Sequence, residues 1–191
     1  RLSAELGLEN RLSMQTTEMV VASLVSLGDS WEPGSDSLLW LLTQCLLLCP
    51  DSSVSELSDQ LACVLPLIQS VATERKEMLL YDQDISSPDW VAACQVSVLA
   101  RFLAVLISRW SPLMTPDLWD FCCCSLVSWS SSLQDTESHL MSASPTAMIA
   151  SSVFHLAGSV SSLMSTSSAD LALPPKLKQE WEEFFSEGIF S

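Results

Sequence analysis

The residues of this sequence best suited to chemistry are its seven cysteines, three of which, Cys122, Cys123 and Cys124, are consecutive. Consecutive side chains on a helix point in different directions, so these thiols form no joint site. A catalytic thiolate also needs a neighbouring histidine or cation that lowers its pKa, and the nearest histidine, His139, lies beyond a serine-rich stretch. We therefore predict that the thiols pack in a core and that no residue of this chain is catalytic.

The cysteines suggest neither a metal centre nor a disulfide framework. Cys45 and Cys49 share one face of an expected helix, but paired Cys-x-x-Cys and His-x-x-x-His spacings are missing, and His139 and His155 are the only histidines. An odd number of cysteines, several within apolar runs, forms no regular set of disulfides. These patterns predict a reducing compartment, with no metal and no cofactor bound to this chain.

Seven tryptophans are many for 191 residues. Five fall at apolar positions of expected helices and are predicted to pack between neighbouring helices: Trp40, Trp90, Trp110, Trp119 and Trp129. Trp31 and Trp181 instead lie near polar residues and are expected to be partly exposed. These two are candidates for contact with a partner protein.

Acidic residues surround one of these tryptophans on the last expected helix. They are Glu180, Glu182, Glu183 and Glu187. A solvated face opposite a buried one is the simpler explanation, and a protein-docking edge is the more specific one. Glu182 and Glu183, together with Trp31 and Trp181, are therefore the candidate partner-contact residues.

The charge balance bears on the kind of partner. Asp and Glu number 23 against eight Lys and Arg, which gives a formal net charge of -15. A surface of that sign repels phosphate backbones, so we expect protein partners and no direct contact with nucleic acid. Arg75, Lys76 and the other scattered basic residues form no patch.

Two apolar segments raise the question of a membrane. Residues 38–49 are too few to span a bilayer, which needs about 20 residues. Residues 91–110 are long enough, but they include Gln95, Arg101 and Arg109, so burial between other helices is the better explanation. We therefore expect no membrane association and a place in the cytosol.

A chain that begins at Arg1 without methionine is also expected to be part of a longer protein.

Three hydroxyl–proline pairs mark helix starts. They are Ser87-Pro88, Thr115-Pro116 and Ser144-Pro145. The hydroxyl accepts hydrogen bonds from amides of the first turn, and proline fits the first helical position because it has no amide hydrogen to leave unpaired. These signals predict helices over residues 88–110 and 116–133, paired as an antiparallel hairpin through the short link 111–115.

Apolar periodicity and turn residues place the other helices. We expect one from Thr17 to a stop at Gly28, one over residues 37–49, and one from Ser53 that Pro66 kinks or splits. Residues 130–144 are expected to form a serine-rich loop, residues 148–163 a helix, and Pro174-Pro175 the start of a last helix that ends near Gly188.

The sequence therefore predicts an all-α chain of seven or eight helices. Only five glycines occur, which disfavours folds that depend on glycine at their turns. Antiparallel helical hairpins in units of about 40 residues favour HEAT/ARM-like repeats stacked as an α-solenoid. We expect one helical-repeat segment over residues 1–191, with possible sub-blocks 1–86 and 87–191, and a compact helical bundle is the structural alternative.

Two runs in the C-terminal half resemble a known family. Residues 115–120, TPDLWD, with 124–129, CSLVSW, are similar to one helix of the HEAT-repeat region of the listerins. The run LPPKLKQEWEEFFSEGIFS, residues 173–191, is similar to a second listerin segment that lies shortly afterwards, and residues 87–110 match more loosely. Residues 1–86 show no clear alignment.

The resemblance implies a structural role. Listerins are RING-type ubiquitin ligases that mark nascent chains stalled on large ribosomal subunits, and a HEAT-repeat arch joins the ends that dock there and recruit a ubiquitin-conjugating enzyme. The zinc of the RING belongs outside this chain, which lacks its ligand pattern. The resemblance therefore implies a spacer within a ligase, and the alternative is a helical-repeat adaptor whose groove binds a protein or peptide.

Overall fold

Helices make up nearly all of the described chain. The computed structural model describes residues 2–27, 31, 34–81, 90–133, 145–166 and 178–179. Its main elements are α1 (Leu2–Ser26), α2 (Ser35–Leu48), η1 (Asp51–Ser53), α3 (Val54–Tyr81), α4 (Trp90–Trp110), η2 (Ser111–Leu113), α5 (Pro116–Leu133) and α6 (Pro145–Thr166). Within these ranges there is no β-strand, which confirms the all-α prediction. The expected last helix lies outside the described residues, except for two helical residues at 178–179.

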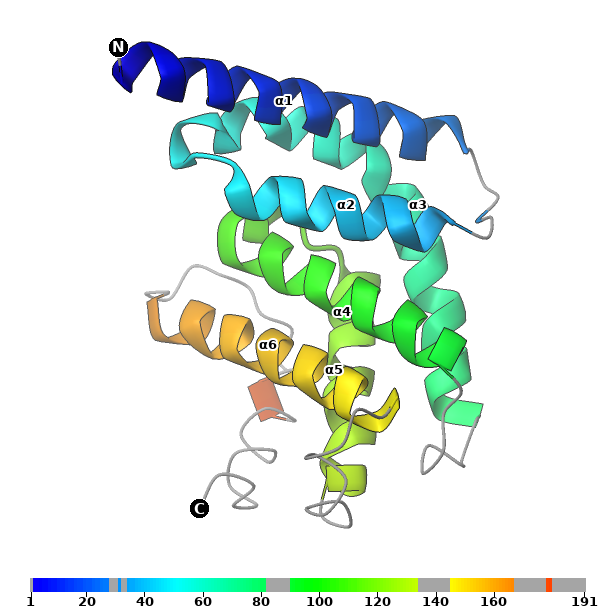
Figure 1. Ribbon diagram of the computed structural model, residues 1–191. Helices are drawn as coiled ribbons and strands as arrows, with labels where there is room; N and C mark the ends of the chain where they lie inside the picture. The colour runs from blue at the N-terminus through cyan, green and yellow to red at the C-terminus, as the bar shows by residue number, and fades with distance from the viewer. Residues whose placement is uncertain are drawn as a thin grey trace.

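The helices stack in two layers. In Figure 1, α2, α4 and α6 lie one below another at the front, with α3 and α5 behind them. Each helix contacts the next one of its own layer, α1 with α3 and α3 with α5 in one, α2 with α4 and α4 with α6 in the other. Contacts between α1 and α2, α3 and α4, and α5 and α6 join the layers. This is the arrangement of an α-solenoid built from helical hairpins.

Local capping chemistry explains where these helices begin. The amide of Leu118 donates to the hydroxyl of Thr115 at 3.4 Å, and α5 starts at Pro116, as the hydroxyl–proline pair predicts. Helix α6 likewise starts at Pro145. Helix α2 instead follows Gly34, whose φ of +109° lies in the left-handed region that glycine adopts without steric cost.

Helix α1 is much longer than the sequence suggests. We expect a start near Thr17, whereas the helix already begins at Leu2. The side chain of Thr17 is buried within the helix, so this hydroxyl residue does not mark a start. Residues 2–16 contain leucine, glutamate, alanine and glutamine, which are good helix formers, and no proline interrupts them.

Helix α3 runs through a proline without breaking. Pro66 lies inside the single helix Val54–Tyr81, so a split at this point is wrong. A proline removes one backbone hydrogen bond and clashes with the preceding turn, which bends a helix that continues past it. Figure 1 shows α3 changing direction partway along its length, as a kink requires.

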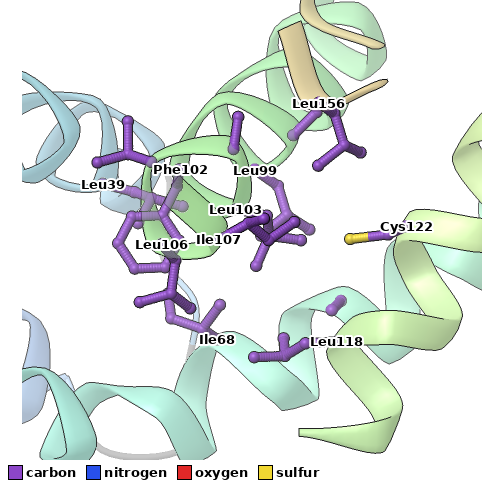
Figure 2. Close-up of a cluster of buried hydrophobic side chains, with 14 of the residues drawn as sticks. Leu39, Ile68, Leu99, Phe102, Leu103, Leu106, Ile107, Leu118, Cys122 and Leu156 are labelled. Atoms are coloured by element: carbon purple, nitrogen blue, oxygen red, sulfur yellow. The ribbon is translucent and has the colours of Figure 1, made fainter. Parts of the chain in front are cut away.

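Helix α4 is the centre of the core. Residues 102–107 are buried without interruption, so this helix is enclosed on nearly all sides. Figure 2 shows Leu99, Phe102, Leu103, Leu106 and Ile107 pointing from α4 toward several surrounding helices. The partners labelled there come from four other helices: Leu39, Ile68, Leu118, Cys122 and Leu156. Full burial of each large apolar side chain contributes about 1.5–3 kcal/mol.

The strong hydropathy of α4 reflects this burial. Its window Cys94–Leu113 has a mean hydropathy of 1.4 and meets the length and composition of a membrane-spanning helix, but 61% of it is buried within the protein. A central core helix has the same composition because it is surrounded by other helices. Protein packing therefore accounts for the apolar character of the segment.

The pairing of α4 differs from the expected hairpin. The sequence predicts that α4 and α5 pack along each other as antiparallel neighbours. In the structure α4 packs mainly along α6, while α5 packs mainly on α3 and crosses the direction of α4 (Figure 1). The reason lies in the link, where η2 and the extended Met114 turn the chain into the other layer.

Candidate functional site: polar clamps between stacked helices

Arg75 joins three parts of the chain. This residue of α3 is only 3% exposed. Its guanidinium forms an ion pair with Asp36 of α2, donates to the backbone carbonyl of Gln95 of α4 at 2.6 Å, and lies 5.5 Å from the ring centroid of Trp31. A buried guanidinium needs such partners because an unpaired charge is costly to remove from water. We call this group the Arg75 clamp.

A second clamp fixes the end of α4. Arg109 donates to the carbonyl of Leu46 near the C-terminus of α2 at 2.6 Å and lies over the ring of Trp110, 5.2 Å from its centroid. The indole Nε1–H of Trp110 donates to the carbonyl of Val54 at 2.8 Å, where α3 begins. The ion pair of Arg109 with Asp51 adds little, because the Asp51 side chain is fully exposed and solvent screens it.

Weaker contacts continue this pattern through the stack. Arg101 Nε donates to the hydroxyl of Ser152 at 3.1 Å, which joins α4 to α6. The hydroxyls of Ser108 and Ser159 lie 3.1 Å apart and join the same two helices. The amide of Gln69 donates to Asp117 and so joins α3 to α5. These polar contacts therefore tie neighbouring helices of the same layer to each other.

The buried thiols are unsuited to nucleophilic chemistry. Cys122 is fully buried, and burial raises the pKa of its thiol well above the ordinary value, with a smaller contribution from Cys123. Burial also raises the pKa of Cys49. A protonated thiol is a poor nucleophile and a poor metal ligand. Among the described residues, no group of three or more His, Cys, Asp or Glu side chains is placed to hold a metal ion.

Two cysteines depart from the sequence prediction. Cys63 and Cys94 are exposed, whereas Cys45, Cys49, Cys122 and Cys123 are buried and Cys124 is half-buried. Cys63 follows Leu61 in an apolar run, but its helix face points to solvent. The general prediction of core thiols is therefore wrong at these two positions, because apolar periodicity in a nearly all-apolar run does not define a face.

This difference gives a labelling prediction. We expect iodoacetamide at neutral pH to modify Cys63 and Cys94 in the folded chain, while Cys122 reacts only after denaturation, because its thiol is both inaccessible and protonated. Peptide mass spectrometry after a short pulse measures each site. Rapid labelling of Cys122 in the native protein, at a rate comparable to that of Cys63, contradicts the structure at this helix.

The candidate partner-contact residues have mixed outcomes. Trp31 is half-buried, its ring packs beside Arg75, and its buried indole Nε1–H has no hydrogen-bond partner among the described residues. Trp181, Glu182 and Glu183 lie outside the described residues. A role for these four residues in partner contact therefore stays a prediction.

The other tryptophans divide between core and surface. Trp110 and Trp119 are buried, at 2% and 6% exposed, as predicted. Trp40 is 48% exposed, so its expected burial between helices is wrong. Helix α2 is apolar around much of its circumference, which hides from the sequence which side meets the core. The structure does not describe the side chains of Trp90 and Trp129, so their expected burial stays a prediction.

The arginine clamps do not follow from the charge pattern of the sequence. The basic residues are scattered along the sequence and form no patch, so nothing in their spacing predicts a joint role. At Arg109 the available signal is an arginine at the end of an apolar helical run, because a charge in such a position is rarely buried without partners. Arg75 lies among the polar residues 73–77 and carries no such signal.

The fold and its clamps define a class of protein. Buried apolar surface and polar clamps between helices serve to hold a stack together, and the described residues bring no titratable groups together for catalysis. This is a helical-repeat scaffold. The chain belongs to the listerin family: the profile of the family described as the listerin HEAT repeat region matches residues 37–190.

Curated relatives agree with this assignment. The chain is similar to E3 ubiquitin-protein ligase listerin of Xenopus tropicalis, with 29% identity over 199 aligned residues, 96% of this chain and 11% of that protein. It is also similar to E3 ubiquitin-protein ligase listerin of Mus musculus, with 29% identity over 134 residues, 67% of this chain and 7% of that protein. The chain thus spans about a tenth of the length of these relatives. No solved structure matches the chain.

Proposed function

We propose that this chain is a semi-rigid spacer within a listerin-type E3 ubiquitin ligase, which sets the distance and direction between the end that docks on the ribosome and the end that carries the RING. The observation that supports the proposal most directly is the single core centred on α4, reinforced by the Arg75 clamp and the Trp110 hydrogen bond. Membership of the listerin family and the similarity to E3 ubiquitin-protein ligases support a ubiquitin ligase as the protein that contains this spacer.

A stacked architecture suits a spacer physically. Each hairpin contacts only its neighbours, so length accumulates without a new core for each added unit. Buried contacts between neighbours resist bending, since bending the stack exposes apolar surface and breaks hydrogen bonds to buried groups. The Arg75–Asp36 ion pair and the Arg109–Leu46 hydrogen bond join the first hairpin (α1 and α2) to the second (α3 and α4). The Trp110–Val54 hydrogen bond acts within the second hairpin, and Arg101 and Ser108 join that hairpin to α6.

The proposal includes the setting of the intact ligase. In it, nascent chains on stalled large ribosomal subunits are the substrates, and a ubiquitin-conjugating enzyme is recruited by a RING that binds zinc outside this chain. In this proposal the spacer itself binds no cofactor and works in the cytosol. It also makes no direct contact with RNA, and its net charge of -15, which repels phosphate, supports this last point.

The test replaces the segment and varies only its length. In the full-length ligase, residues 1–191 are exchanged for an unrelated designed helical-repeat stack of either three hairpins or two. We expect the three-hairpin stack to retain nascent-chain ubiquitylation. The two-hairpin stack is expected to retain ribosome binding but lose about tenfold in ubiquitylation, because a connector that cannot span two sites lowers the effective concentration between them.

Two results would contradict the spacer. Equal ubiquitylation with two and three hairpins shows that length is immaterial. Loss of ubiquitylation with the three-hairpin stack, while ribosome binding persists, shows that this particular sequence is required, which is what the adaptor alternative predicts. Ribosome co-sedimentation and ubiquitylation of a stalled reporter chain are measured on the same samples.

A further inference from the structure

Charge is divided unequally between the two helical layers. Helices α1, α3 and α5 carry nine acidic residues, whereas α2, α4 and α6 carry one, Asp36, which is paired with Arg75. Helix α4 contributes Arg101 and Arg109, and α6 contributes His155. The layer of α2, α4 and α6 is therefore free of the strong negative charge that the rest of the chain carries.

A groove runs along this weakly charged layer, with α4 as its floor and α2 and α6 as its walls. One cavity, of about 260 Å³, is lined by residues that include Trp40, Arg101 and Met148. A second cavity, of about 180 Å³, is lined by residues that include Leu47, Arg101 and His155. Arg101 belongs to both, so the two cavities adjoin. No Asp or Glu lines either cavity.

The floor of the groove has the spacing of one helix face. Its α4 residues are Cys94, Ser97, Val98, Arg101, Ala104, Val105, Ser108 and Arg109. At 1.5 Å per residue these positions extend over about 22 Å. An extended peptide of about six or seven residues has that length.

Unsatisfied polar groups lie in the groove. Arg101 is exposed, and its only hydrogen bond among the described residues is from Nε to Ser152, which leaves both terminal guanidinium nitrogens available. A planar pair of N–H donors binds a carboxylate with two parallel hydrogen bonds. Ser97 is 3% exposed, lines the same groove, and its hydroxyl has no hydrogen-bond partner among the described residues. The hydroxyl oxygen itself has almost no accessible surface, so Arg101 is the polar group that a ligand in the groove can reach.

Apolar surface flanks these polar groups. Trp40 and Leu47, one heptad apart on α2, are 48% and 56% exposed and line neighbouring cavities. Large aromatic and aliphatic side chains left open beside a cavity are typical of the pockets that anchor a bound peptide.

We propose that this groove binds an acidic, apolar peptide segment of a partner protein. A carboxylate of the peptide pairs with the guanidinium of Arg101, and large apolar side chains on either side of it occupy the hollow beside Trp40 and the surface beside Leu47. RNA fits the groove less well, because two arginines in a largely apolar lining neutralise few phosphates. The proposal is independent of the spacer function.

The experiment starts from an unbiased set of peptides. A display library of random 12-residue peptides is selected on the immobilised chain, and the R101E variant serves as the counter-selection surface. We expect the enriched peptides to share Asp or Glu flanked by large apolar residues. A fluorescein-labelled copy of an enriched peptide is then titrated with each variant and followed by fluorescence anisotropy.

The variants separate the groove from general charge effects. R101E is expected to weaken binding at least about tenfold, since it replaces a charge-assisted pair by repulsion. W40A weakens binding by removing the apolar anchor. K178E makes the same change in charge at an exposed residue that does not line the groove, and is expected to leave the affinity within about twofold. R101Q supplies a second variant with no added negative charge, and circular dichroism confirms the fold of each protein.

Several outcomes overturn the proposal. These are the absence of any enrichment, enrichment of basic or uncharged peptides, and equal binding of the selected peptide to R101E and to the unsubstituted chain. Displacement of the peptide by a 12-nucleotide oligouridylate also counts against it, because the groove would then be a phosphate-binding surface. None of these measurements depends on ubiquitylation, so the spacer proposal stands or falls separately.

Discussion

Replacing Trp110 with alanine is expected to lower the free energy of unfolding by about 3–5 kcal/mol, the usual cost of truncating a buried aromatic residue. Trp110 is 2% exposed, and its Nε1–H donates to the carbonyl of Val54. Alanine leaves a cavity at the end of α4 and removes one hydrogen bond from the Val54 carbonyl, which keeps the bond from the Ser58 hydroxyl. It also removes the ring beneath Arg109. Urea unfolding of the chain, followed by circular dichroism, measures the change.

Two other substitutions show which part of the effect is packing. W110F keeps an aromatic ring but loses the hydrogen-bond donor, so it should lower the free energy of unfolding by less than W110A does. The loss of the hydrogen bond to Val54 alone should cost about 1 kcal/mol. W40A removes the same side chain from a site that is 48% exposed, and should cost much less than W110A. If W110A and W40A destabilise the chain equally, Trp110 is not buried at the end of α4 as the structure has it.

Replacing Asp36 with alanine is the second large effect, at about 3–5 kcal/mol, because it leaves a buried guanidinium without its counter-ion. The Arg75 side chain is 4% exposed and that of Asp36 is 23% exposed. The penalty therefore falls on Arg75, which retains the Gln95 carbonyl and the Trp31 ring but no negative charge. Urea unfolding at neutral pH measures the change.

A double substitution tests this explanation. R75M removes the buried charge, so D36A introduced together with R75M should cost less than D36A alone. D51A provides a matched control, since Asp51 pairs with Arg109 but is fully exposed, and we expect no measurable destabilisation. If D36A costs no more than D51A, the Arg75 clamp contributes nothing to the stack.

Both effects concern contacts made by the second hairpin, α3 with α4. Asp36 and Arg75 connect α2 to α3 and α4, and Trp110 connects α4 to the start of α3. Loss of the Asp36 pair loosens the second hairpin relative to the first, whereas loss of Trp110 loosens the pairing of α3 with α4 inside the second hairpin. In the proposed spacer, such variants would reduce the precision with which the far end of the ligase is placed, before they unfold the chain.

Several local features were predictable because their causes lie in adjacent residues. Thr115-Pro116 gives the start of α5, where the hydroxyl of Thr115 caps the amide of Leu118. Pro145 gives the start of α6, and the apolar runs give the existence and type of the main helices. The burial of Trp110 and Trp119 follows from their positions on helices rich in apolar residues.

Other features could not be predicted, because they depend on residues far apart in the chain. Cys63, Cys94 and Trp40 are exposed although they lie in apolar runs, since a helix that is apolar on most sides does not reveal which side its neighbours cover. The partners of Arg75 are separated from it by 39 and 20 residues along the chain, and Trp110 lies 56 residues from its acceptor. The preference of α4 for α6 over α5 also arises only from their packing.

The sequence by itself determined that this protein is helical and where several of its helices start, because capping, proline geometry and apolar periodicity act over a few residues. The family was indicated separately, by the resemblance of residues 115–129 and 173–191 to listerin segments. Only the tertiary structure decided which helix is central, which arginines are clamps and which layer carries a groove without carboxylates. These properties depend on how whole helices pack, and packing is set by shape and burial between distant segments rather than by local preference.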